Sequence, residues 1–209
     1  MNPYKPLITK YSGHTTIIRR IGKNNKVLDV GCNDGYLGIN ADKTNQFYGL
    51  DFSAICVNNA KLSGYIEAIQ YDLNLLQELP WKKKFDVIIF ADVLEHVLYP
   101  KKVIEFFTQN YLAENGHIIF SLPNVANWQI RANLLFGKFK YTETGILDKT
   151  HLHLYTYFSA TDLVCSANLN IEHIESGARF FGYILAWIPA LRGLLATNII
   201  ITSVKKNNI

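Results

Sequence analysis

Short apolar runs alternate with longer amphipathic stretches along most of the chain. The runs are rich in Val, Ile, Leu and Phe and are bounded by Gly, Asn, Asp or Lys, a pattern that predicts β-strands. We expect strands at 26–30, 46–51, 69–72, 85–90, 116–122, 170–175 and 198–205, and helices at about 36–43, 53–62, 100–112 and 159–167, the last with Ser159 as its N-cap. Continuously apolar strands indicate a mostly parallel sheet that is covered by helices on both faces. The predicted fold class is therefore α/β, with seven strands.

Two segments depart from this alternation. Residues 124–150 mix aromatic and basic side chains with glycines, which predicts an insertion after the fifth strand. Residues 180–195, within a connection at 178–196, read FFGYILAWIPALRGLL and carry one charge, Arg192. This stretch is too short and too interrupted to span a bilayer, and too apolar for a free loop. It is expected to pack as a buried helix, to form a homodimer interface, or to lie on a membrane surface with Tyr183 and Trp187 at headgroup depth; we favour the membrane over the dimer.

Composition and charge narrow the class of protein. The chain has 209 residues and a net charge of +4, and its longest basic run is three lysines, so we expect one domain over 1–209 and no nucleic-acid partner. Its three cysteines have neither disulfide-framework nor zinc-site spacing, which favours a reducing cytoplasm. The N-terminus shows no apolar run typical of a signal peptide.

The strongest motif is VLDVGCNDGYLG, in which an expected strand leads through a glycine-spaced turn into a helix. Gly31 permits a tight turn and close approach to a ligand, and the first amides of the helix after Gly35 face the same place. Asp51 ends the second strand, where a carboxylate can accept both hydroxyls of a ribose. Asp72, after the third strand, is placed to meet an adenine. The spacing from Gly31 through Asn33 to Gly35 is not that of an NAD-binding turn.

Four segments in order, VLDVGCNDG, GLDFS, FDVIIFADVLEHV and GHIIFSLPN, resemble the signature motifs of class I S-adenosylmethionine (SAM)-dependent methyltransferases over about residues 20–175. The resemblance implies an enzyme with a Rossmann-like fold and SAM as its cofactor. It implies contacts with the cofactor in a methionine-side loop, at the ribose, at the adenine and at the sulfonium. The residues expected to make them are Asp29, Gly31, Cys32, Asn33, Gly35, Asp51, Phe52, Asp72, Leu73 and Ala91. Asn33 replaces the usual middle glycine, and asparagine tolerates a left-handed backbone.

Candidate catalytic groups follow the fourth strand in the segment DVLEH. Asp92 and Glu95 are three residues apart and would share one face of a helical turn, with His96 adjacent. His151 is the favoured general base, since imidazole titrates near neutral pH, and His153 would point the same way in an extended chain. Glu95 and His96 complete the expected catalytic set, although Glu95 as a surface charge and His96 as a structural brace stay open.

A divalent metal bound by the same group is a further alternative, although no metal is included in the expected site. Asp92, Glu95, His96 and His151 form a mixed set of carboxylates and imidazoles, which suits Mn²⁺ or Zn²⁺ better than Mg²⁺. The resemblance supports this alternative, because small-RNA terminal methyltransferases of the class use a similar cluster.

Within the class, the chain resembles ubiquinone-biosynthesis O-methyltransferases, MetW-like proteins and methyltransferases of bacterial surface-polysaccharide clusters. The segment TGILDKTHLH is most similar to the polysaccharide group, and SLPNVANWQIRANLLF to the MetW-like group. The resemblance therefore implies O-methylation of a sugar or lipid-linked glycan. From the cysteines and the apolar segment we expect the protein in the cytoplasm or peripheral to the inner membrane. The alternatives are a quinone-type O-methyltransferase and a SAM-binding accessory protein that works through a partner enzyme. The insertion 124–150 is expected to form the acceptor pocket or a small packed subdomain.

Overall fold

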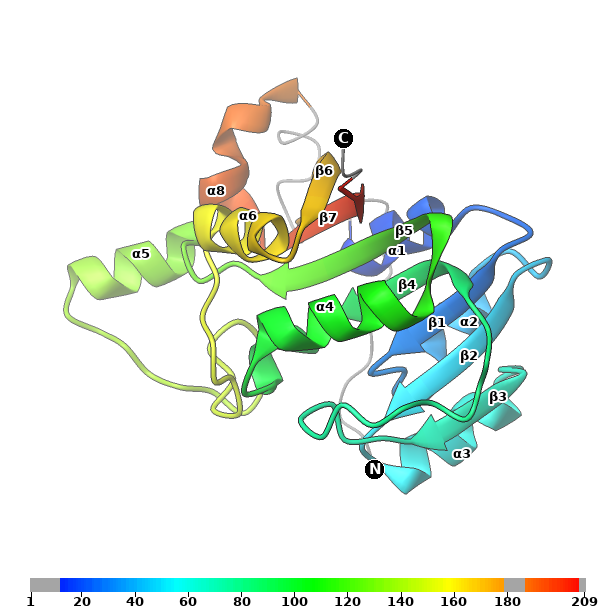
Figure 1. Cartoon of the computed structure of the whole chain (residues 1–209). Coiled ribbons are helices and arrows are strands. Elements are labelled where there is room, and N and C mark those ends of the chain that lie inside the picture. The colour runs from blue at the N-terminus through cyan, green and yellow to red at the C-terminus, as the bar shows by residue number, and fades with distance from the viewer. Residues whose placement is uncertain (1–11, 179–186, 207–209) are drawn as a thin grey trace.

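A seven-stranded sheet forms the centre of the computed structural model, which describes residues 12–178 and 187–206 (Figure 1). Its strand order is β3-β2-β1-β4-β5-β7-β6. Every pairing is parallel except those of β7, which runs antiparallel to β5 and β6. The strands are β1 (Lys26–Val30), β2 (Gln46–Asp51), β3 (Glu67–Gln70), β4 (Phe85–Ala91), β5 (Leu112–Pro123), β6 (Leu169–Gly177) and β7 (Asn198–Lys205). The predicted fold class is confirmed.

Helices cover both faces of this sheet. They are α1 (Gly13–Ile21), α2 (Tyr36–Asn40), α3 (Ala54–Leu62), α4 (Pro100–Tyr111), α5 (Trp128–Leu135), α6 (Tyr157–Ser166) and α8 (Arg192–Leu195), with short 3₁₀ turns η1 (Leu94–His96) and η2 (Pro189–Leu191). Successive strand residues point to opposite faces, so Val27 packs with α1, α2 and α3, whereas Leu28 packs with α4 and α6. This two-sided burial explains why the strands are continuously apolar.

The seven expected strands are all present, with small shifts at their ends. The third strand covers Glu67–Gln70 and so lies two residues earlier than expected, and α2 ends at Asn40. Helix α6 begins earlier than predicted, because its N-cap is Thr156 and not Ser159. The Thr156 hydroxyl accepts from the Ser159 amide, while the Ser159 hydroxyl accepts from the Thr156 amide, so Ser159 is the third residue of a capping box.

Two helices were not expected from the sequence. Helix α1 begins after Ser12, whose hydroxyl accepts from the Thr15 amide, and it packs Ile17 and Ile21 under the sheet. Helix α5 begins after Asn127 inside the predicted insertion and projects away from the sheet (Figure 1). Its apolar residues are spread around the helix, so no single face predicted it.

The apolar connection is described only in part, since residues 179–186 lie outside the described residues. Trp187 is 74% exposed and Ile188 49% exposed, while Leu191 and Leu195 pack against Ala178 and Ala196. Among the described residues, no helix has both the length and the apolar composition needed to cross a bilayer. The described part of this connection is therefore divided between a packed side and an exposed apolar end.

Candidate functional site

The glycine turn after β1 is held tightly against β2. The amides of Gly31 and Cys32 both donate to the carbonyl of Leu50, at 2.8 and 2.9 Å. Gly31 has φ +79°, and a Cβ there would lie 2.8 Å from Cγ2 of Val93, so glycine is required both by the backbone and by the close approach of the β4 loop. Asn33 adopts φ +46°, a left-handed conformation that asparagine tolerates.

Asp51 organises this turn from the end of β2. Its Oδ2 accepts from the Asn33 amide at 2.9 Å, and its Oδ1 accepts from the Ser53 amide at 2.8 Å. Each carboxylate oxygen has a second lone pair, so the side chain can fix the loop and still accept from a ribose hydroxyl. The two motifs that the sequence predicted to cooperate are therefore physically joined.

The other predicted cofactor residues lie around the same strand ends in different environments. Phe52 is 72% exposed and is available to cover a flat ligand, and the Asp72 carboxylate accepts from the Asn74 amide at 2.9 Å. Leu73 packs partly against the core, Cys32 is buried and Ala91 ends β4. The roles of these residues in cofactor binding stay predictions.

Asp29 differs from the rest because it is buried beneath the turn. The Tyr65 hydroxyl donates to its Oδ2 at 2.5 Å, while its Oδ1 has no hydrogen-bond partner among the described residues. Burial raises the pKa of the Asp29 carboxyl to about 7, and the nearby charge of Asp51 adds to the increase. An unpaired buried oxygen next to the turn fits a ligand that brings its own donor.

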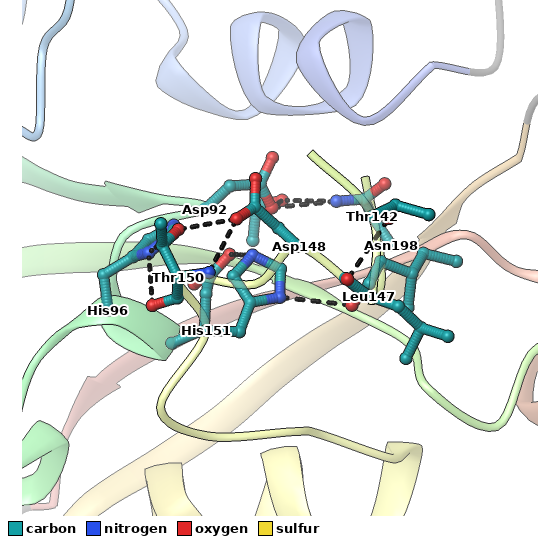
Figure 2. A network of polar contacts seen from close by, with 11 residues as sticks. Asp92, His96, Thr142, Leu147, Asp148, Thr150, His151 and Asn198 are labelled. Carbon is teal, nitrogen blue, oxygen red and sulfur yellow. Dashed lines mark hydrogen bonds and ion pairs between the residues drawn. The ribbon is translucent and has the colours of Figure 1, made fainter. Parts of the chain in front are cut away.

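Asp92 follows the end of β4, and its side chain is hydrogen-bonded to β5 and β7. Its Oδ1 accepts from the Ser121 hydroxyl at 2.7 Å. The same oxygen accepts from the side-chain amide of Asn198 at 2.8 Å (Figure 2). The residue has φ +52° and precedes the 3₁₀ turn. The expectation that Asp92 and Glu95 share one face of a helical turn is wrong, because this left-handed residue directs the carboxylate toward β5 and β7.

Glu95 is buried, which corrects the alternative of a surface charge. It is 1% exposed, and its Oε2 has no partner within the described part of the chain. Burial raises the pKa of the Glu95 carboxyl well above its ordinary value, and the charge of Asp92 raises it further. Its backbone carbonyl accepts from the amides of Leu152 and His153, which holds the later loop over the β4 end.

His151 is placed by this loop with one ring nitrogen fixed and the other directed inward. Nδ1 lies 3.1 Å from the Ile146 carbonyl and must donate to it, which leaves Nε2 as the acceptor, 3.9 Å from Oε1 of Glu95. The side chain is 6% exposed. Burial lowers the pKa of His151, and the nearby His96 lowers it further, so its neutral form predominates at neutral pH.

His96 completes a cluster with these two residues. Its ring meets that of His151 edge to face with centroids 4.8 Å apart, and its Nδ1 lies 3.2 Å from the Thr150 carbonyl. Glu95, His96 and His151 each offer one metal-ligand atom, and these three atoms lie within 4.8 Å of one another. His153 is outside the group, since its Nε2 lies 3.0 Å from the Val97 carbonyl. The structure thus assembles the three expected catalytic residues without Asp92 or His153.

Several residues near the cluster were missed from the sequence. Asp148 accepts from the amide and hydroxyl of Thr150, and its charge acts on both histidines; the spacing of Asp148 and Thr150 is a turn signal that could have indicated this loop. Asn198 reaches Asp92 from the first residue of β7, and His14 comes near Asp92 on the unpredicted α1. No local pattern in the sequence relates those two positions to β4.

Comparison with known families decides the class. A family model described as a methyltransferase domain matches residues 8–174. The chain belongs to the methyltransferase domain family. The expectation of a methyltransferase domain that uses SAM is thereby confirmed, and the strand-end positions of the glycine turn and Asp51 agree with it.

Individual relatives resemble the chain more distantly. The mitochondrial ubiquinone biosynthesis O-methyltransferase of Candida albicans is 34% identical over 86 residues, a match to 37% of this chain that spans only 26% of that relative. A SAM-dependent methyltransferase from Mesorhizobium loti has a TM-score of 0.64 at 18% identity, covering 90% of this chain and 95% of that one. Magnesium protoporphyrin IX methyltransferase from Synechocystis, with bound SAH, has a TM-score of 0.64 at 16% identity, covering 92% and 81%. At these identities the two structures support the fold.

Proposed function

We propose that this protein transfers the methyl group of SAM to a hydroxyl group of its acceptor, with His151 as the general base. The observation that carries the proposal is the state of the His151 ring. The Ile146 carbonyl fixes Nδ1 as the donor, and Nε2 is left as a neutral acceptor beside Glu95, in the 3₁₀ turn after β4. A general base needs this state before it removes a proton.

The residues of the chain divide the work between binding and proton transfer. When bound, SAM supplies an electrophilic methyl carbon, whose bond to sulfur breaks as the bond to the acceptor oxygen forms. The Gly31 turn and Asp51 hold the cofactor at the strand ends, and the unpaired Oδ1 of Asp29 can accept from it. His151 takes the acceptor proton on Nε2. The charges of Asp148 and Asp92 favour the resulting imidazolium.

We propose a sugar or a lipid-linked glycan as the acceptor, in surface-polysaccharide synthesis. Helix α5 and the segment after it support an acceptor surface, because Trp128, Phe136, Phe139 and Tyr141 are all at least 40% exposed. Exposed aromatic faces of this kind suit a sugar ring or an apolar carrier. A quinone-type acceptor is the second candidate, since the Candida albicans relative acts in ubiquinone biosynthesis.

Methyl transfer from tritium-labelled SAM separates these acceptors. The protein is incubated with a lipid-linked oligosaccharide and, in parallel, with a polyprenylated dihydroxybenzoate. Label in the oligosaccharide is expected. Label only in the dihydroxybenzoate would replace the glycan by the quinone-type acceptor. Tight SAM binding with no label in either compound would contradict both acceptors and favour the accessory role, which recovery of a bound partner acyltransferase would then support.

A divalent cation is a second candidate for activating the acceptor hydroxyl. The specific observation is the grouping of Glu95, His96 and His151, with Oε2 of Glu95 buried and unpaired. Two imidazoles and one carboxylate suit Mn²⁺ or Zn²⁺. Such an ion would lower the pKa of a bound hydroxyl without a protein base. Loss of turnover in EDTA, and its recovery on adding Mn²⁺ or Zn²⁺, would favour this candidate; turnover that survives EDTA favours His151 alone.

Peripheral contact with a membrane through residues 180–195 is part of the same proposal. The exposed rings and alkyl groups of Trp187 and Ile188 support it within the described part of this segment. A lipid-linked acceptor would bring the site to the inner face of the membrane, which accords with a cytoplasmic or peripheral protein. A homodimer through the same segment is the competing use of this surface.

A further inference from the structure

Two arginines line a cavity whose lining includes none of the candidate catalytic residues. It has a volume of about 450 Å³ and is located between α5, the start of α6 and α8, which lie on one side of the sheet (Figure 1). Its lining includes Ala126, Arg131, Thr156, Phe158, Ala190 and Arg192. We call it the arginine cavity.

Each guanidinium of the arginine cavity is fixed by a backbone carbonyl. Nε of Arg131 donates to the Ala126 carbonyl at 2.6 Å, and one terminal nitrogen of Arg192 donates to the Ile174 carbonyl at 2.7 Å. Each side chain keeps further N–H groups beyond the one used in this way. Two planar donors are therefore positioned in advance at the same cavity.

Neither guanidinium has a carboxylate partner in the described part of the chain. All 17 Asp and Glu side chains fall within residues 12–178, and none of their ion pairs involves Arg131 or Arg192. Two positive charges at one cavity repel each other, and an anion between them would remove that cost. Arginine binds phosphate oxygens through paired N–H groups, which makes a phosphate the matching ligand.

The remaining lining suits a ligand that is apolar next to its charge. Phe158 is 79% exposed, and Ala126 and Ala190 contribute methyl groups. Helix α6 starts at the same cavity, so the positive end of its dipole adds to the field of the arginines. The lining therefore fits a phosphate ester that has an organic body attached.

The loop that carries His151 connects this cavity to the candidate active site. Five residues after His151, Thr156 lines the cavity. Between them lies Tyr155, which is buried; this burial raises the pKa of the tyrosine, and the charge of Glu95 adds to the increase. The backbone carbonyl of Tyr155 accepts from the Val125 amide at 2.8 Å, which fixes the loop against the end of β5. One loop therefore carries His151 at the cluster and Thr156 at the cavity.

We infer that the arginine cavity binds a phosphate or diphosphate group, and that this group belongs to the methyl acceptor. The second part rests on the proposed function, and the first part does not. The acceptor hydroxyl would then be oriented by the anchored phosphate, with Arg131 and Arg192 as binding residues that take no part in the chemical step.

Calorimetric titration with inorganic pyrophosphate tests the cavity without any acceptor. The full chain is expected to bind it saturably. Arg131→Gln and Arg192→Gln are each expected to weaken binding about tenfold to hundredfold, since each removes a charge-assisted contact. Lys138→Gln with Lys140→Gln is the matched control, because these exposed cations lie outside the cavity, and this control should bind like the wild type.

A second pair of variants keeps the test independent of folding. Ala190→Glu places a carboxylate in the cavity and should abolish binding, whereas the neutral Ala190→Gln should retain it. Binding of S-adenosylhomocysteine is measured on the same samples. Absence of saturable pyrophosphate binding by the wild type, or equal binding by Ala190→Glu, would overturn the cavity proposal even if the cofactor still binds. If the protein binds pyrophosphate but transfers no methyl group, the anion site in the cavity is supported and the proposal that the phosphate belongs to the methyl acceptor is contradicted.

The source of the phosphate is decided by a parallel measurement. Co-sedimentation with phosphatidylglycerol vesicles is compared between the wild type and Arg131→Gln with Arg192→Gln. A phosphorylated acceptor is supported if the wild type binds pyrophosphate saturably and if the wild type and the double variant bind vesicles equally. Vesicle binding that is lost with the arginines, in a protein that ignores pyrophosphate, would contradict that assignment and favour a lipid headgroup.

Discussion

Nε2 of His151 lies 3.9 Å from Oε1 of Glu95, and both side chains are almost fully buried. The Ile146 carbonyl determines the tautomer of the histidine, while burial raises the pKa of the glutamate and lowers that of the histidine. The two shifts have the same cause, since burial disfavours the charged form of each group. The pair therefore rests near neutrality and is prepared to accept one proton.

The pH dependence of turnover should report the histidine. Its pKa is lowered below the ordinary 6.5, so the neutral base is already present at pH 7. In EDTA-treated protein, kcat should rise with pH through a window below 6.5 and stay level between about 7 and 8. An apparent pKa above 7 in the kcat profile would show that another group is the base.

Asp29 should make stability depend on pH in a defined direction. Its pKa is about 7 in the folded protein and about 3.8 when exposed, so its contribution to the free energy of unfolding is lost as pH rises from about 4 through 7. Asp29→Asn keeps the shape and an acceptor for Tyr65 but cannot ionise. In urea unfolding, the free energy of unfolding of the variant relative to the wild type should rise by a few kcal/mol between pH 4 and 8, since each pKa unit is worth about 1.4 kcal/mol.

The exposed Asp162 provides the control for this measurement. Asp162→Asn should follow the wild-type stability curve at every pH. Parallel curves for Asp29→Asn and the wild type would mean that Asp29 is already ionised below pH 4 in the folded protein.

Asp51→Ala should weaken cofactor binding through two losses. The variant lacks the acceptors for the Asn33 and Ser53 amides, so the turn loosens, and it lacks the carboxylate predicted to bind the ribose. Calorimetry with S-adenosylhomocysteine should show a loss of about 1–3 kcal/mol, roughly 5- to 150-fold in Kd. An unchanged Kd in Asp51→Ala would place the ribose elsewhere.

Membrane contact should depend on the exposed end of the apolar connection. Trp187→Glu with Ile188→Glu should abolish co-sedimentation with anionic vesicles at low salt, since both side chains are exposed and the change adds two negative charges. Leu62→Glu is the control, because Leu62 is 87% exposed on α3, on another part of the molecule (Figure 1). If the wild type stays in the supernatant, the segment serves another contact.

Most of the sheet could be predicted from the sequence because buried strands have a strong local signature. Runs such as VIIF at 87–90 are apolar at successive positions. The glycine turn and Asp51 lie at the ends of two strands that must be side by side in a parallel sheet. Helix α1 has a local signal as well, since Ser12 is an N-cap and the buried Ile17 and Ile21 are four residues apart, but it precedes the first strand and lies outside the alternation on which the prediction was based. The N-cap of α6 was misplaced because Thr156 and Ser159 are both good caps and only the hydrogen bonds distinguish them.

The sequence predicted which residues form the candidate catalytic cluster, but it did not predict their geometry. DVLEH suggested one helical face, but the left-handed backbone of Asp92 separates that carboxylate from Glu95. Aspartate tolerates this conformation, but the sequence does not indicate which aspartate adopts it. Burial of Glu95 depends on the loop at 151–153 covering it, a contact across more than 50 residues of sequence. A contact between residues this far apart in the chain produces no periodic pattern in the sequence.

The most direct test of the account compares turnover of the wild type and His151→Ala under the same saturating SAM and acceptor, in EDTA. The account predicts that kcat falls by about 10²–10⁴ while the Kd for SAM is unchanged, since His151 acts on the acceptor proton and not on the cofactor. Turnover of His151→Ala within a fewfold of the wild type would contradict the assignment of His151 as the base.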